Sequence, residues 1–324
     1  MTRGDIRAIM LQLGRNMWGN WRAEGESLLP SERYSYDRVL FDETLWHRTT
    51  DYMVQRGMNM ILLDLGEFVR YPRCPELAVE GSWSAERLNA EVRRLRSVGL
   101  EPIPKLNFSA NHIAWLKEYG RMVSTEPYYR VCRDLIADAS EIFEHPRFLH
   151  IGFDEEHGRS SRQHVVCRQG ELWWHDFLLL VGACEDRGMR TWMWSDYGWH
   201  HPDFVKRCPK SVMQSNWYYD DDLQGFDPDD GKNHHKHILD LFLALDREGF
   251  EQIPCGSNWV SPVMKAAGLD NDASVGQLVD FCRARIRPDL LKGFLVTPWD
   301  DGLLTERDFR HTLKAIDLLA DKCG

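Results

Sequence analysis

The sequence lacks any apolar run long enough to cross a membrane. A bilayer-spanning helix needs roughly 18 consecutive apolar residues, and no segment of this chain approaches that length. The first residues, Met1 to Asp5, lead directly into a strand-like segment without the apolar core of a signal peptide. These absences predict a protein without membrane contact, located in the cytoplasm.

Paired cysteines and other metal-binding patterns are also lacking. The eight cysteines are scattered and none forms a C-x-x-C pair, which favours reduced thiols over disulfides or a zinc site. His234, His235 and His237 lie close together, but Lys236 interrupts them and the segment before them is rich in glycine and proline. A solvated loop that enters a helix is the interpretation favoured over a metal site. We therefore expect no metal and no cofactor.

The chain has no excess of positive charge and no flexible linker. Its 40 basic residues are outnumbered by 50 acidic ones, for a formal net charge of -10, and no basic block exceeds a few residues. Binding to a polyanionic nucleic acid is therefore disfavoured, and a neutral or basic ligand fits better. The 324 residues suffice for one large α/β domain or two ordinary ones, but no segment rich in proline, glycine and serine divides them.

Short apolar runs alternate with longer amphipathic segments along the whole chain. The expected strands are Ile6–Leu13, Asn59–Leu65, Glu101–Phe108, Phe148–Phe153, Arg190–Ser195, Ser211–Trp217, Gln252–Ser257 and Gly293–Pro298. The expected helices are Glu43–Arg56, Ala85–Val98, Tyr128–Glu144, Gly170–Arg187, Pro202–Arg207, His235–Glu248, Val275–Arg285 and Glu306–Asp321, four of them followed by Gly57, Gly99, Gly188 or Gly249 as a stop signal. This alternation predicts an α/β fold, a single (β/α)8 TIM barrel across residues 1–324. A doubly wound sheet is the alternative, but the sequence has no glycine-rich phosphate loop.

The segment Phe148–Glu156 is the most informative one, because a short apolar run ends there in three adjacent carboxylates. Since side chains alternate along a strand, His150, Gly152 and Asp154 share one side of it. In a parallel barrel that side faces the axis, so Asp154 and Glu155 are expected at the mouth, where barrel enzymes carry their active sites. The alternative is a helix N-terminus, where acidic residues favour the helix dipole without any role in chemistry.

Aromatic residues gather beside carboxylates at the ends of the expected strands. The chain has 13 tryptophans, and several follow strand ends, such as Trp194 before Asp196 and Trp299 before Asp301. Flat apolar walls beside hydrogen-bonding acids are what a sugar ring requires. Any single tryptophan could instead be packed in the core, but their repetition at strand ends favours a carbohydrate pocket.

These motifs resemble those of family 20 glycoside hydrolases, the β-N-acetylhexosaminidases and their relatives, over nearly the whole chain. The segment His150–Glu155 is similar to the family's His-x-Gly-Gly-Asp-Glu. Met58–Leu65 resembles the family's second strand, and Gly99–Lys105 followed by Asn111–His112 resembles its third strand and histidine loop. Trp299–Asp301 is similar to a Trp-x-Glu motif at the eighth strand.

The resemblance implies a retaining, substrate-assisted mechanism, in which the sugar's own 2-acetamido oxygen attacks the anomeric carbon. Glu155 would be the general acid and base, and Asp154 would orient the acetamido group and stabilise the oxazolinium intermediate. Glu156 would be a structural residue at the rim. The implied substrate-binding residues are Arg15, Asp64, His112, Trp194, Trp217, Tyr218, Trp299 and Asp301. The partner would be a small carbohydrate, and self-association into a homo-oligomer is left open.

The sequence departs from the family pattern in three respects. Phe153 replaces the family's second glycine, although its strand phase directs it toward the helices. The family's Tyr-x-Asp, which holds the acetamido group, has no counterpart near Gly256–Trp259, and Trp217–Asp220 after the preceding strand is the nearest substitute. The small α/β accessory domain that often precedes this barrel is not expected either. An exo-glycosidase of different glycone specificity and a non-catalytic glycan-binding barrel therefore stay as alternatives.

Overall fold

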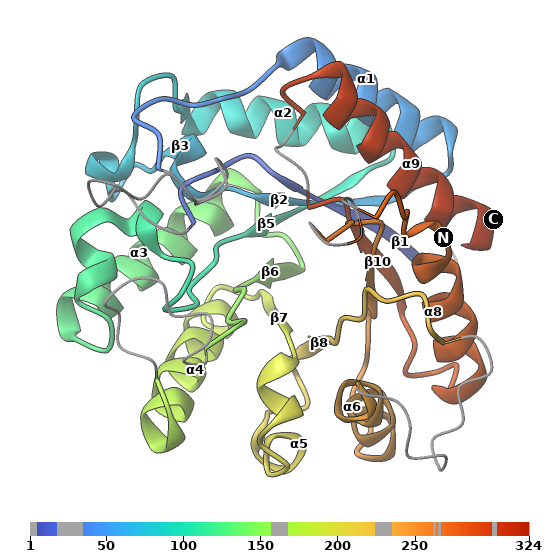
Figure 1. The fold of residues 1–324 in the computed structure, drawn as a ribbon. Helices are drawn as coiled ribbons and strands as arrows, with labels where there is room; N and C mark the ends of the chain where they lie inside the picture. Colours follow the sequence, from blue (N-terminus) through green and yellow to red (C-terminus); the bar gives the residue numbers. More distant parts are fainter. Residues whose placement is uncertain are drawn as a thin grey trace.

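The chain folds into a barrel of eight parallel strands surrounded by helices (Figure 1). The computed structural model describes residues 5–17, 35–156, 168–223, 235–261, 264, 267–299 and 303–323. Neighbouring strands pair in the order β8-β7-β6-β5-β2-β1-β10-β9. Parallel bridges from Gln214 to Gln252 and from Trp217 to Cys255 join the two outermost strands and close the ring. The predicted TIM barrel is therefore confirmed, while its extent as one domain over the whole chain stays a prediction.

All eight expected strands and all eight expected helices are present, with shifted ends. The barrel strands are β1 (Ile6–Gln12), β2 (Met60–Asp64), β5 (Glu101–Lys105), β6 (Phe148–His150), β7 (Arg190–Trp194), β8 (Met213–Ser215), β9 (Cys255–Ser257) and β10 (Gly293–Thr297). The helices are α1 (Glu43–Gln55), α2 (Ala85–Ser97), α3 (Glu126–Ile142), α4 (Gly170–Glu185), α5 (Phe204–Arg207), α6 (Lys236–Arg247), α8 (Asp272–Arg285) and α9 (Glu306–Cys323).

Local signals account for the ends of several helices. The side chains of Asp42 and Ser84 accept hydrogen bonds from the first turns of α1 and α2, which satisfies backbone donors that the helix itself leaves unpaired. Helix α3 begins two residues before its predicted start because Pro127 occupies its first turn, where the missing N–H costs nothing. The four glycines predicted to stop helices all have positive φ, between 71° and 89°, as left-handed helix ends require.

Several short elements between the strands and helices were not predicted. Strands β3 (Val69–Arg70) and β4 (Trp83–Ser84) form a separate two-stranded sheet, and short 3-10 helices follow strand ends, namely η2 (Gly66–Phe68), η3 (Pro75–Leu77), η4 (Ala114–Arg121) and η5 (Asp196–Trp199). Segments this short carry no measurable hydrophobic period, so periodicity alone does not reveal them.

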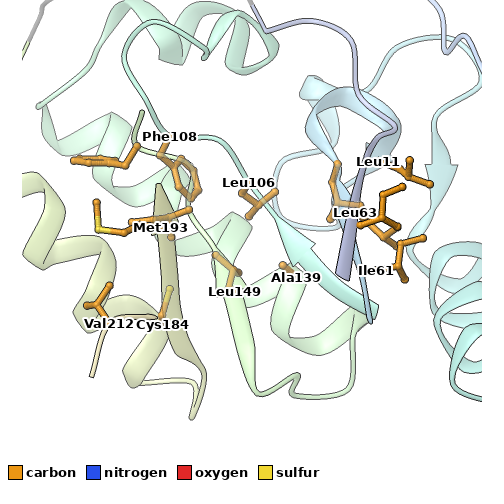
Figure 2. Close-up of a cluster of buried hydrophobic side chains, with 14 of the residues drawn as sticks. Leu11, Ile61, Leu63, Leu106, Phe108, Ala139, Leu149, Cys184, Met193 and Val212 are labelled. Atoms are coloured by element: carbon orange, nitrogen blue, oxygen red, sulfur yellow. The ribbon is translucent and has the colours of Figure 1, made fainter. Parts of the chain in front are cut away.

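Two apolar cores lie on opposite sides of the barrel wall. Side chains such as Met10, Leu62 and Ile103 fill the barrel interior. The alternate residues of the same strands, including Leu11, Ile61, Leu63, Leu106, Leu149 and Met193, pack outward against the helix layer (Figure 2). Each buried side chain of this size contributes about 1.5–3 kcal/mol to the free energy of folding. A shift of one residue would turn the apolar side chains of a strand to the wrong face, so their alternation determines which side of the strand faces the axis. Among the described residues, no helix combines the length and the apolar character needed to cross a bilayer.

Candidate active site

The predicted catalytic pair lies just beyond the C-terminal end of β6. The strand ends at His150, three residues earlier than predicted, and the following backbone is irregular. Gly152, Phe153 and Glu155 all have positive φ, of 70°, 73° and 55°. For residues with a side chain this conformation is strained, and such strain is often found at functional sites. The pattern of faces is nonetheless as predicted, since Phe153 packs on the aromatic rings of α4.

Gly152 allows the loop after β5 to approach the catalytic pair. A Cβ atom at this position would lie 2.1 Å from the Oδ1 atom of Asn107, so only glycine fits. The Nδ2 atom of Asn107 donates a hydrogen bond of 3.1 Å to Oδ1 of Asp154. Ser109 and Asn111, from the same loop, donate to the backbone carbonyls of Asp154 and Glu155. The loop after β5 therefore holds the peptide that carries the pair.

His112 lies between the two carboxylates. Its Nδ1 atom is 3.3 Å from Oδ2 of Asp154, and its Nε2 atom is 3.2 Å from Oε2 of Glu155. Burial opposes a charge on this ring, but the two carboxylates outweigh burial and raise the pKa of His112 to about 10. At neutral pH the ring is therefore an imidazolium that forms ion pairs with both acids.

Asp154 is held in its ionised form. Burial alone would raise the pKa of Asp154, but the charge and hydrogen bond of His112, the charge of Lys105 and the Asn107 amide lower it well below its usual value. Each carboxylate oxygen has two lone pairs and uses one in these contacts. The buried Asp154 carboxylate can therefore accept one more hydrogen bond at each oxygen from a ligand.

Glu155 and Glu156 have opposite surroundings. The Glu155 side chain is 38% exposed beside His112. Glu156 has a side chain only 1% exposed and forms an ion pair with Arg168, which is itself completely buried. Arg168 also binds Asp176 at 3.1 Å and stacks on Phe153. Only Glu155 of the two is accessible to a ligand in this arrangement.

Tryptophan rings line the barrel interior and its mouth. Trp194 is buried at the end of β7, with its ring centroid 4.6 Å from that of His150 and 6.3 Å from that of Trp299. Trp217 packs against the interior core and stacks on Tyr219, with centroids 4.9 Å apart. Trp194, Trp217 and Trp299, all predicted substrate-binding residues, thus border the same barrel interior.

The side chain of Tyr218 does not border the barrel interior. It is buried in the outer core, among residues that face the helices, and its hydroxyl donates to Asp222. The alternation of side chains directs Tyr219 toward the axis instead, where it packs against the interior core. The structure therefore places Tyr219, and not the predicted Tyr218, on the interior side of this segment, and a substrate-binding role of either residue stays a prediction.

Of the remaining predicted binding residues, Arg15 and Asp64 lie within the described part of the chain. Arg15 follows β1 and is buried, with its backbone N–H donating to Glu67 at 2.6 Å. Asp64 ends β2 and forms an ion pair with Lys105 inside the barrel, where burial raises the pKa of Asp64 and Lys105 opposes that effect. Asp301 lies outside the described residues. The substrate-binding roles of all these residues stay predictions.

Three polar residues that the sequence does not predict as part of the site lie beside the predicted catalytic pair. Asn107, Lys105 and Asp196 were not assigned to the site, although Lys105 occupies an inward strand position, where a charged residue is itself a signal. The sequence indicates Asp196 only as an acid that follows Trp194 at the end of an expected strand. No group of three or more metal-ligating side chains is found in the described part of the chain, and His234 lies outside it.

Comparison with known proteins identifies the same barrel in solved glycoside hydrolase structures. Neither a protein-family model nor a curated protein sequence matches the chain. Dispersin B is 15% identical, with a TM-score of 0.59, and the match covers 98% of this chain and 99% of that one. A pneumococcal family 20 exo-β-D-N-acetylglucosaminidase module is 12% identical, with a TM-score of 0.62 and coverages of 99% and 83%. A family 20 exo-β-N-acetylglucosaminidase from Vibrio harveyi is 12% identical, with a TM-score of 0.57.

These similarities establish the fold. The resemblance found in the sequence is confirmed at this level, since the chain shares its barrel with family 20 glycoside hydrolases. It spans about half the length of the Vibrio structure, 54% of which is matched. A family 5 glycoside hydrolase from Prevotella bryantii has the same barrel, with 14% identity and a TM-score of 0.56. The fold alone therefore does not select one glycosidase chemistry, and the site must do so.

Proposed function

We propose that this chain is a retaining exo-β-glycosidase, a β-N-acetylhexosaminidase that acts on terminal 2-acetamido sugars by substrate-assisted catalysis. The observation that carries the proposal is the pairing of an ionised, buried Asp154 with an accessible Glu155 through His112. One acid that stays charged beside a second that can reach the ligand is the division of labour that this reaction needs.

Glu155 is the proposed general acid and base. It would protonate the glycosidic oxygen as the aglycone leaves, and it would later take a proton from the water that attacks the intermediate. Its partial exposure gives it access to the scissile bond, whereas Glu156 is occupied by Arg168.

Asp154 is the proposed partner of the acetamido group. A carboxylate that accepts the amide N–H turns the acetamido oxygen toward the anomeric carbon, and its negative charge stabilises the positive oxazolinium ring that forms. Asn107 and His112 hold the carboxylate in place before the substrate arrives, so it does not need to reorganise during the reaction.

The aromatic side chains support a sugar ligand. Trp194, Trp217, Tyr219 and Trp299 surround one interior next to the carboxylates, and flat rings match the apolar faces of a pyranose. The solved structures with this barrel that are described as β-N-acetylglucosaminidases agree with this substrate class. Two alternatives stay open, an exo-glycosidase of different glycone specificity and a non-catalytic glycan-binding barrel.

A panel of aryl glycosides separates these functions. Purified protein is incubated with matched nitrophenyl β- and α-glycosides of acetamido and non-acetamido sugars, and glycan binding is measured in parallel by calorimetry. Release of nitrophenol from the N-acetyl-β-hexosaminides is the expected result. Release from another glycone instead supports the first alternative, and binding without any release supports the second.

A further inference from the structure

Asp196 is a buried acid that the proposed mechanism does not use. It begins η5, just after β7, and is only 6% exposed. Its Oδ2 atom accepts a hydrogen bond of 2.9 Å from the backbone N–H of Glu155. Its buried Oδ1 atom has no hydrogen-bond partner, and the side chain has no ion pair with any described lysine, arginine or histidine. A buried carboxylate without a cation is costly, so a proton is expected to neutralise it.

The ionisable groups that face Asp196 are themselves acids. Asp154 and Glu155, from the loop after β6, are the two whose charges act on it. Burial first, and then the negative charge of Asp154, raises the pKa of Asp196 to about 8. Asp154 shifts in the opposite direction because His112 and Lys105 act on it. Two interacting acids whose pKa values are driven apart hold one proton between them at neutral pH, and here it resides on Asp196.

The contact between Asp196 and Glu155 bears on the geometry of the proposed general acid. Glu155 has a φ of 55°, a conformation that a residue with a side chain keeps only when its surroundings enforce it. The Asp196 carboxyl holds the N–H of Glu155, and the Asn111 amide holds its carbonyl oxygen. The two contacts fix the peptide groups on both sides of the Glu155 side chain.

We propose that Asp196 is a positioning residue that carries a proton at neutral pH and, in this uncharged form, holds Glu155 in place as the general acid. The inference rests on the proposed function. A charged Asp196 would accept the Glu155 N–H more strongly, but it would add a third negative charge beside Asp154 and Glu155, and the repulsion between these side chains would displace the Glu155 carboxylate from its position. The site therefore works with Asp196 protonated, and it loses activity as Asp196 ionises.

Three variants test this assignment. Asp196→Asn replaces the protonated acid by an uncharged group of the same shape, which can still accept the Glu155 N–H. Asp196→Ala removes the contact altogether. Asp203→Asn is the matched control, because Asp203 follows the same strand but its side chain is 55% exposed.

The first measurement needs no substrate. Thermal unfolding is followed from pH 4 to pH 9 for the full chain and each variant. An acid whose folded pKa is raised from about 4 to about 8 stabilises the fold most below the lower value, and that contribution is lost as the pH rises through the upper one. We expect Tm of Asp196→Asn to rise relative to the parent between these values, while the Asp203→Asn difference stays flat. A flat Asp196→Asn difference would overturn the proton assignment.

The second measurement uses the aryl glycoside that the panel identifies. At neutral pH, Asp196→Asn should retain at least about tenfold more kcat than Asp196→Ala, with little change of KM in either. Above pH 8 the parent should lose kcat/KM more steeply than Asp196→Asn. Equal loss in both variants, or identical profiles for the parent and Asp196→Asn, would contradict the positioning role. If no glycoside is cleaved, the proposed function and this role fail together, and the unfolding data still decide where the proton resides.

Discussion

Glu156 and Arg168 form a buried ion pair one residue away from the accessible Glu155. Adjacent residues on the loop after β6 are thus directed to opposite environments, one into the protein and one toward the barrel mouth. The left-handed backbone at Glu155 interrupts the regular alternation of a strand, in which Asp154 and Glu155 would face opposite sides, whereas here both side chains contact His112. The structure therefore distinguishes two glutamates that the sequence places side by side.

Replacing these two glutamates should have different effects on catalysis. Loss of a general acid costs about 10²–10⁴-fold in rate, so Glu155→Gln should nearly abolish kcat. Glu156→Gln should stay within roughly tenfold of the parent when measured well below its Tm. The measurement is kcat on an activated aryl glycoside and on one with a poor leaving group, where the need for an acid is greatest. Equal losses would contradict the assignment of Glu155.

The same two replacements should affect stability in the opposite order, with Glu156→Gln more destabilising than Glu155→Gln. Breaking a buried ion pair leaves an uncompensated charge and costs about 3–5 kcal/mol. For Glu156→Gln the loss should lie toward the lower end, because Arg168 keeps Asp176 and the carbonyl of Phe108. Glu155→Gln, at an accessible side chain, should change the free energy of urea unfolding by less than about 1 kcal/mol. A Glu156→Gln protein as stable as the parent would show that the pair contributes nothing.

Gly152 should tolerate no side chain. Gly152→Ala places a Cβ atom against Asn107, which would withdraw the amide from Asp154, so both stability and kcat/KM should fall, the latter by at least about tenfold. Gly188→Ala is the control, because its φ of 71° is nearly the same but its Cβ would meet nothing within 4 Å. The control should lose only about 1–2 kcal/mol of unfolding free energy, the cost of a left-handed backbone for a residue with a Cβ atom. Its kcat/KM should not change. Similar kinetics in the two variants would disprove the role of Asn107.

The pH dependence of stability should report the charge on His112. The pKa of His112 in the folded protein, about 10, lies above its usual value of 6.5. The contribution of the charged ring to the free energy of unfolding is therefore complete below the lower value and is lost as the pH rises through the upper one. The free energy of unfolding should therefore decline between about pH 6.5 and pH 10, a window in which His112→Gln should show a flatter profile. His47→Gln, at a side chain 44% exposed, is the control. A slope unchanged by His112→Gln would show that the ring is neutral.

Catalysis should not require a metal ion. The proposed mechanism uses carboxylates, an imidazolium and the substrate, so kcat/KM should be unchanged after exhaustive treatment with EDTA. The measurement compares treated and untreated protein with and without added divalent ions. Loss of activity that zinc or calcium restores would instead assign a function to the histidines at 234–237.

Much of the fold could be predicted because it depends on local sequence periods. Residues such as Leu62 and Leu63 alternate between the barrel interior and the helix layer, and the same alternation is found in β1, β6, β7 and β10. Glycines at 57 and 99 marked helix ends because few other residues adopt left-handed φ. Two-residue strands and 3-10 turns were missed because they are too short to have a period.

The candidate site was only partly predictable, since it depends on contacts between distant segments. The approach of Asn107 to Gly152, 45 residues away, and the contact of Asp196 with Glu155 arise from the closed barrel rather than from any local motif. The sequence predicts Tyr218 as a binding residue, whereas Tyr219 faces the interior, as does Trp217 two residues earlier.

The preference for a 2-acetamido group tests the central claim most directly. If the sugar supplies the nucleophile, a glycoside that lacks the acetamido group cannot form the intermediate. It forgoes part of an effective-molarity advantage that can reach roughly 7–11 kcal/mol. The measurement is kcat/KM on an aryl N-acetyl-β-hexosaminide and on the matching β-glucoside or β-galactoside, for the parent and for Asp154→Asn. We expect a preference of at least about 10³-fold that Asp154→Asn largely removes, together with competitive inhibition by an oxazoline-mimicking thiazoline. Comparable rates on the sugars without an acetamido group, with no inhibition by the thiazoline, would contradict the account.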